Sequence, residues 1–238
     1  MTSTRKPSGS PRPNRATARR RQRQRRQAPV VAVVVGVVVV LAVIAFVATR
    51  GDSGDGGGVA TSGGTGVAQV RPVSVTGQPL AVLPDGRKDP AVGQVIPDVS
   101  GQSFDGTPVR IGNDGRAKLL FIVAHWCPHC QKEVPLVTSW LKDKTLPART
   151  DVVAISTAVN RANGNYPPSA WLSREKWPVP TLADDSRGTA ASAFGLSGYP
   201  FIVAVDASGK VVDRTSGEQP ASVLDRMLAE ATGASTAG

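Results

Sequence analysis

The feature that most constrains the fold of this chain is an apolar run at residues 118–124, which leads three residues later into the first of two cysteines. So continuous a run is typical of a strand that is buried on both faces of a sheet. Residues 127–142 then place apolar side chains at helical spacing, with Pro135 expected to kink the helix. A second buried strand is expected at 151–157. This order predicts an α/β domain.

The flanking patterns complete this domain. A strand at 108–111 follows the Asp105-Gly106 turn, and the last helix, 220–232, has Pro220 in its first turn and Gly233 beyond its end. Between them we expect short helices at 169–176 and 189–194 and a hairpin of strands at 201–205 and 210–214. Helix and strand alternate and a hairpin follows, so the pattern predicts a mixed sheet.

The net charge of +10 belongs to one end of the chain. Lysine and arginine total 28 against 18 acidic residues, but ten of the basic residues lie within residues 1–28, which hold no acid. The other 210 residues are therefore electrically neutral. We expect a disordered basic tail at 1–28 and no nucleic-acid partner.

Residues 29–48 carry no charge and include eleven valines. A helix of this length spans about 30 Å, the thickness of the hydrocarbon core of a bilayer. The sequence therefore predicts one transmembrane helix, and the basic flank places the tail in the cytoplasm and the rest outside the plasma membrane. A cleaved signal peptide is the alternative. Residues 49–92, rich in glycine and proline, are expected to form a flexible linker to a domain at 93–238.

Cys127 and Cys130 are the only cysteines in the chain, which excludes a disulfide-dense scaffold. At a helix N-terminus a thiolate is stabilised by unpaired N–H groups and by the helix dipole. The spacing therefore predicts a redox pair, with Cys127 as the exposed nucleophile and Cys130 as the sheltered resolving thiol. His129 between them favours the thiolate, and Pro128 stiffens the turn. A purely structural disulfide would close too short a loop to stabilise the fold much.

His125 and His129 flank the cysteines and raise the alternative of a zinc or copper site. Four ligands this close along one strand–helix junction cannot easily surround a tetrahedral ion, so we expect no metal and no cofactor. Haem attachment is disfavoured because Gln131, not histidine, follows the second cysteine. His125 is expected to be a polar residue at the rim of the site.

The region from Val92 to Lys142 resembles the start of membrane-anchored thioredoxin-like proteins of the TlpA/ResA type. The likeness covers roughly 140 residues. It rests on the following motifs: Gly93-x-x-Ile96-Pro97-Asp98, Asp105-Gly106, Trp126-Cys127-x-x-Cys130, Glu133 and Pro135, Asp184-Asp185, Ala193-Phe194-Gly195-Leu196, Gly198-Tyr199-Pro200 and Val205-Asp206-x-x-Gly209-Lys210.

This resemblance implies a thioredoxin-like fold with a mixed central sheet, preceded by one transmembrane helix. It implies a cis peptide bond at Pro200, facing the sulfurs, and a Tyr199 backbone that can pair with a substrate strand. It also implies that Glu133, six residues after Cys127, is a proton acceptor for Cys130. Thioredoxin itself instead has an acid six residues before its first cysteine, at the position where Phe121 stands here.

These observations predict a membrane-tethered thiol–disulfide oxidoreductase that acts outside the cytoplasm on cysteines of exported proteins and exchanges electrons with a membrane or soluble redox partner. The Pro-His pair between the cysteines is typical of DsbA-like oxidases and favours oxidation or isomerisation. Reduction, for example of apocytochrome cysteines, stays open, as does a copper-binding thioredoxin-like carrier. Five residues are expected to form an apolar docking groove: Trp126, Pro128, Tyr199, Pro200 and Phe201.

Overall fold

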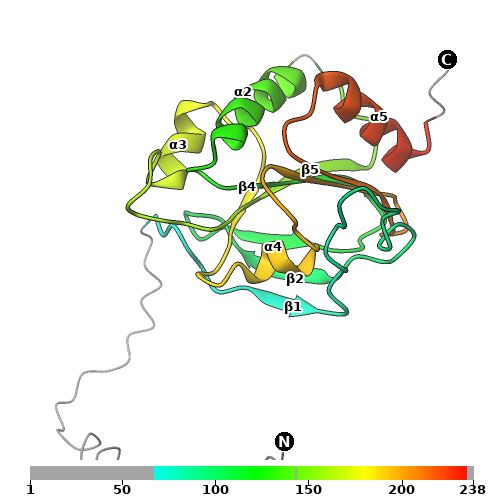
Figure 1. Ribbon diagram of the computed structural model, residues 1–238, viewed down its shortest axis with the longest axis horizontal. Helices are drawn as coiled ribbons and strands as arrows, with labels where there is room; N and C mark the ends of the chain where they lie inside the picture. Colours follow the sequence, from blue (N-terminus) through cyan, green and yellow to red (C-terminus); the bar gives the residue numbers. More distant parts are fainter. Residues whose placement is uncertain (1–66, 143, 235–238) are drawn as a thin grey trace, which may run out of the picture. The chain divides into compact units, whose positions relative to one another are not determined.

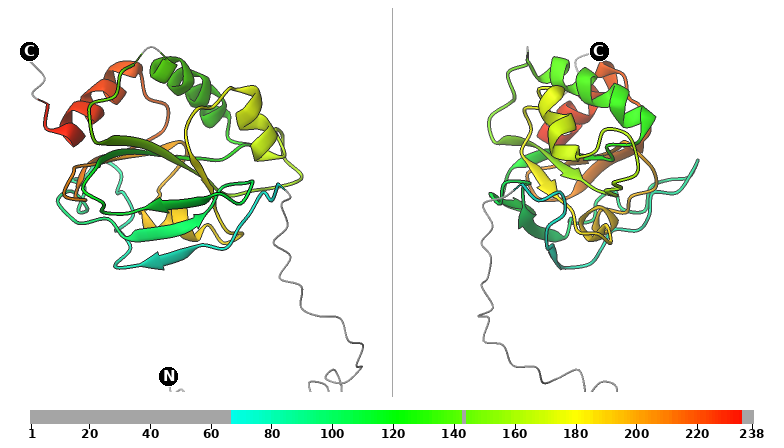
Figure 2. Two further views of the ribbon diagram at one scale, coloured as in Figure 1. Left: turned by 180° about the vertical axis from the view of Figure 1, so that it is seen from behind. Right: turned by 90° about the vertical axis from the view of Figure 1, so that its left-hand side faces the viewer.

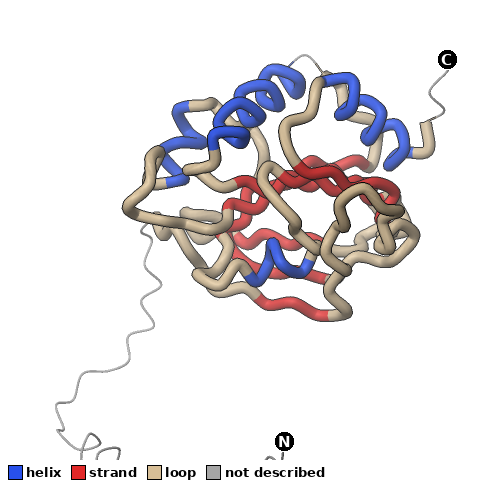
Figure 3. The backbone as a smooth tube through the Cα atoms, viewed as in Figure 1, coloured by secondary structure: helices blue, strands red, loops and turns tan. Residues whose placement is uncertain are grey.

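The structure, a computed structural model, describes residues 67–142 and 144–234 (Figure 1). Its centre is a five-stranded sheet in the order β6-β5-β4-β7-β8. The β4, β5 and β6 strands run parallel, while β7 is antiparallel to both β4 and β8. The strands of this sheet (red in Figure 3) are β4 (Ala117–Val123), β5 (Thr150–Ser156), β6 (Thr181–Ala183), β7 (Phe201–Val205) and β8 (Val211–Ser216).

All seven residues of β4 are buried, because the sheet is covered on both faces. On one face Leu119 and Phe121 pack in a cluster with residues of α2 (Pro128–Lys142) and α5 (Ala221–Thr232). On the other face the alternate residues Leu120 and Ile122 pack in a second cluster. This alternation is the side-chain period of a strand. Figure 2 shows the helical layer on one side of the sheet in both views.

The opposite layer is a small antiparallel sheet together with the short helix α4 (Thr189–Ala193). Its strands are β1 (Ser74–Thr76), β2 (Asp98–Gln102) and β3 (Pro108–Ile111). The third helix of the helical layer is α3 (Pro168–Arg174).

The α/β class and the mixed central sheet are confirmed, and the expected elements differ from the observed ones by at most two residues at either end. Strands β1, β2 and β6 were not predicted. The linker predicted at 49–92 is too long, because β1 pairs with β2, and Leu80 and Ala91 are buried in the core. Residues 1–66, which include the predicted tail and transmembrane helix, lie outside the described residues. Among the residues that are described, no helix is long and apolar enough to cross a membrane.

A buried arginine ties the segment around residues 81–89 to the central sheet. The Arg214 side chain in β8 is fully buried and donates from Nε and Nη2 to the Asp89 carboxylate at 2.8 and 2.5 Å. Its Nη1 donates to the carbonyl oxygens of Ala81 and Phe194 at 2.9 and 2.8 Å. The guanidinium also lies 5.9 Å from the ring of Phe201, the first residue of β7. Arg214 therefore joins the segment at 81–89 and Phe194 to strand β8, and it does so next to Phe201, the residue that follows Pro200.

We predict that Asp89→Ala lowers the free energy of unfolding by about 3–5 kcal/mol, because it leaves the buried guanidinium of Arg214 without its counter-charge. Urea unfolding measures the loss. The matched control is Asp98→Ala, which removes the carboxylate partner of the exposed Arg110 and should cost much less. Equal losses in the two variants would contradict this role of the buried pair.

Candidate active site

Both cysteines lie where β4 turns into α2. Cys127 directly precedes the helix and Cys130 lies in its first turn. The turn is closed by the Cys127 N–H, which donates to the Ala124 carbonyl oxygen at 3.0 Å. The Ala124 N–H in turn donates to Cys130 Sγ at 3.4 Å. The end of the buried strand therefore fixes both sulfurs at the N-terminus of the helix.

The two sulfurs are free thiols in unequal surroundings. Cys127 is 6% exposed and Cys130 is fully buried, so the predicted exposed nucleophile is only the more accessible of two buried thiols. Burial raises the pKa of Cys130 far above its ordinary value, and the nearby Cys127 and Glu133 raise it further. Cys130 therefore stays protonated at neutral pH unless a neighbouring group takes its proton.

Tyr199 and Pro200 face the cysteines, as the resemblance implies. The Tyr199–Pro200 peptide bond is cis, and Cys127 Sγ lies 3.7 Å from the Tyr199 carbonyl oxygen as a donor. The Tyr199 ring packs edge-on against Trp126, with ring centroids 5.8 Å apart. The indole N–H of Trp126 donates to the Ala158 carbonyl oxygen at 2.7 Å. Two aromatic rings thus stand next to the more accessible sulfur, beside the exposed Pro128.

Glu133 is a buried carboxyl group three residues after Cys130 on the same helix, a spacing that places the two side chains on one face. Its Oε2 accepts a hydrogen bond from the Gln219 N–H at 3.0 Å, and its Oε1 has no hydrogen-bond partner in the described part of the chain. Burial raises the pKa of Glu133 to about 7, against the opposing effect of the Gln219 bond, and Glu218 adds to the rise. A group of this pKa can both take and return a proton near neutral pH.

His129 is exposed, and its imidazole contacts Glu218, a partner that the sequence did not predict. Its Nδ1 lies 2.5 Å from Glu218 Oε1, in the loop between β8 and α5. Lys132 Nζ donates to the same oxygen at 3.1 Å. Glu218 and Gln219 lie more than 80 residues from their partners on α2, and no local sequence signal marks them.

The structure corrects two expectations. His125 is fully buried rather than at the rim, because its Nδ1 is bonded to the Gly164 carbonyl oxygen at 2.8 Å and its Nε2 accepts the Asn160 N–H at 3.1 Å. Phe201 cannot belong to the docking groove, because it is fully buried within the core cluster. Pro200 is buried as well, whereas Trp126 and Tyr199 are half-buried.

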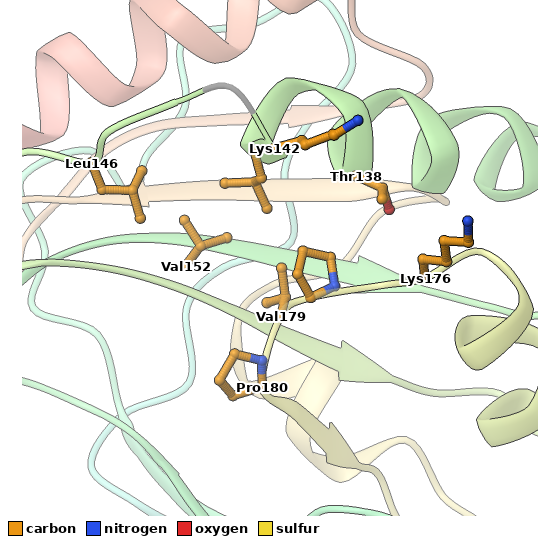
Figure 4. A pocket seen from close by; sticks show the side chains of 9 residues that line it. Thr138, Lys142, Leu146, Val152, Lys176, Val179 and Pro180 are labelled. Atoms are coloured by element: carbon orange, nitrogen blue, oxygen red, sulfur yellow. The ribbon is translucent and has the colours of Figure 1, made fainter.

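An apolar groove of about 540 Å³ lies near the other end of α2 (Figure 4). The side chains of Val152, Val179 and Pro180 line it, with Lys142 and Lys176 nearby. Thr138 is the groove residue that lies nearest the cysteines along α2, eight residues after Cys130 or about 12 Å at about 1.5 Å per residue. The groove is therefore separate from the redox site.

Comparison with known proteins also indicates thiol–disulfide chemistry. Residues 91–230 match the Redoxin family, which is more than half of the chain. A thiol:disulfide interchange protein DsbE homolog from Paracoccus denitrificans is 28% identical over 138 residues, covering 56% of this chain and 71% of that protein. The methylamine utilization protein MauD from Methylophilus methylotrophus is 28% identical over 126 residues, covering 52% of this chain and 54% of MauD. A solution structure from Neisseria meningitidis, named as a thioredoxin, aligns with a TM-score of 0.50 and 20% identity over 62% of this chain and 95% of that one, which shows the fold.

The raised pKa of Glu133 predicts a pH-dependent cost in stability. A carboxyl group with a pKa of about 7 in the folded state and 4.5 when unfolded stabilises the fold below pH 4.5, and this contribution is lost as the pH rises to 7. We predict that Glu133→Gln, which stays neutral, gains about 3 kcal/mol relative to the unchanged protein between pH 4.5 and pH 8. Urea unfolding under reducing conditions measures the difference.

The control for this prediction is Glu230→Gln, an exposed glutamate on α5 that is paired with Arg226. Its effect on stability should change little over the same pH range. A pH-independent effect of Glu133→Gln would show that burying the ionised carboxylate does not destabilise the fold.

Proposed function

Since this chain belongs to the Redoxin family and is a thiol–disulfide oxidoreductase, we propose that it acts outside the cytoplasm on the cysteines of exported proteins. The observation that carries the proposal is the pair of sulfurs at the N-terminus of α2, with one slightly accessible and the other fully buried. Such an asymmetric pair suits a reaction in which one thiol meets the substrate and the other resolves the intermediate.

The proposed exchange starts at Cys127. In the reducing direction its thiolate attacks a substrate disulfide, a mixed disulfide forms, and the other substrate sulfur leaves as a thiolate. The Cys130 thiolate then attacks Cys127 Sγ, which forms the Cys127–Cys130 disulfide and releases the second substrate thiolate. Oxidation of a substrate runs through the same steps in reverse, so atoms and electrons balance in both directions.

Glu133 is the group proposed to move the proton of Cys130. The thiol of Cys130 cannot ionise easily in its buried site, and a carboxylate on the next helical turn can accept its proton, directly or through water. Since the pKa of Glu133 is raised to about 7, the group is partly ionised near neutral pH and can also return the proton when the disulfide is reduced.

Trp126, Pro128 and Tyr199 are proposed to form the surface on which a substrate segment docks. The Tyr199 carbonyl oxygen lies next to Cys127 Sγ, where it can pair with the backbone of an extended peptide. Pro200 has no N–H to compete for that pairing. The edge-on packing of Trp126 and Tyr199 offers an apolar contact beside the accessible sulfur.

For the direction of electron flow, we propose oxidation or isomerisation, because an imidazole between the cysteines favours the Cys127 thiolate when it is protonated. Reduction is the second candidate. It is favoured by the bond between His129 and Glu218, since a carboxylate partner offsets the charge that would stabilise the thiolate. A membrane or soluble redox partner would set the direction in the cell.

A further part of the proposal is the attachment to the plasma membrane. It is supported by the uncharged residues 29–48 and by the ten basic residues that precede them. Residues 1–28 would then lie in the cytoplasm and the folded domain outside.

We predict that Cys127→Ser reduces turnover of a disulfide or dithiol substrate to the uncatalysed rate, because it removes the attacking sulfur. Cys130→Ser should instead accumulate a mixed disulfide, visible as a mass increase that dithiothreitol removes. The chain has only two cysteines, so any such adduct on Cys130→Ser must be on Cys127. Retention of turnover by Cys127→Ser would contradict the mechanism.

A further inference from the structure

The loop that joins β8 to α5 contacts the first two turns of α2 at three points. The Glu218 carboxylate bonds to His129 Nδ1 at 2.5 Å and to Lys132 Nζ at 3.1 Å. The next residue, Gln219, donates its backbone N–H to Glu133 at 3.0 Å. One short loop therefore holds both the imidazole between the cysteines and the buried carboxyl group behind them.

The charge of Glu218 is not accounted for by the stability of the fold. Its bonds to His129 and Lys132 hold the pKa of Glu218 below its usual value, so its carboxylate is ionised at neutral pH. However, the side chains of His129, Lys132 and Glu218 are 61%, 68% and 37% exposed, and ion pairs so exposed to water stabilise proteins little. These charges lie beside the cysteine pair, and the stability of a thiolate depends on the charges near it.

The imidazole of His129 is committed to this carboxylate. Within residues 67–142 and 144–234, no hydrogen bond joins His129 to either sulfur, and Cys127 Sγ instead contacts the Tyr199 carbonyl oxygen. We propose that Glu218 is a positioning residue of the redox reaction: it holds His129 away from Cys127 and so restrains the oxidising strength of the cysteine pair.

The effect follows from the equilibrium with glutathione. Two glutathione thiols reduce the Cys127–Cys130 disulfide to two thiols and leave as one glutathione disulfide. A cation that approaches the Cys127 thiolate stabilises the reduced protein and drives this reaction forward. Glu218 opposes this, because its negative charge lies against the imidazole of His129 and its hydrogen bond fixes the direction in which the ring points. Removing the carboxylate frees His129 to approach Cys127.

The test is the equilibrium constant of the full-length protein with glutathione at pH 6, where imidazoles are largely protonated. We expect Glu218→Gln to raise the constant about tenfold, which corresponds to about 30 mV. In a His129→Gln background the same substitution should raise it less than about threefold, because the group that Glu218 restrains is gone. The matched control, Glu230→Gln on the exposed face of α5, should leave the constant unchanged.

Two results would overturn the proposal. An unchanged or lower constant in Glu218→Gln would show that the carboxylate does not restrain oxidation. An equal rise with and without His129 would show that Glu218 acts on the thiolate directly and does not position the imidazole. If Glu218 only holds the loop in place, Glu218→Gln should lower the unfolding temperature, and its effect on the equilibrium constant should not depend on His129.

Discussion

The burial of β4 on both faces is the constraint on which the redox site depends. This strand lies at the centre of the five-stranded sheet, between β5 and β7, and both of its faces are covered. Because it cannot shift without exposing its apolar side chains, the point where it ends is fixed. The helix that follows it therefore begins at a fixed place, with both sulfurs at its N-terminus. The neighbouring strand β7 is preceded by Pro200, which brings the Tyr199 carbonyl oxygen to the accessible sulfur.

Unequal burial then gives the two thiols the different roles that the proposed exchange requires. Cys130 is packed with Val123, Val134 and Trp171, so its proton is difficult to remove without help from a base. Glu133 lies on the same face of α2 and is itself buried, which is why its pKa lies near neutrality. The loop before α5 contacts both Glu133 and His129. The proton and the charge of the site are thus both influenced from one loop, far from the cysteines in sequence.

The fold and the cysteine pair were predictable because their signals are local. A continuous apolar strand, a helical pattern and a two-residue spacer between cysteines lie within 25 residues of one another. Strands β1 and β6 were missed because each has three residues and lies at the edge of its sheet, so neither has a hydrophobic pattern of its own. The burial of His125 and the pairing of His129 were missed for another reason. Both depend on backbone or side chains 35 to 89 residues away, which no local pattern places.

The reduction potential of the full-length protein, equilibrated with glutathione, tests the central claim most directly. His129 favours the thiolate and Glu218 restrains it, so the account predicts a potential near that of protein disulfide isomerase, about −180 mV. Such a value suits a protein that oxidises or isomerises the cysteines of exported proteins. A value at or below about −270 mV, the thioredoxin range, would contradict this direction and identify a reductant that needs a supply of electrons.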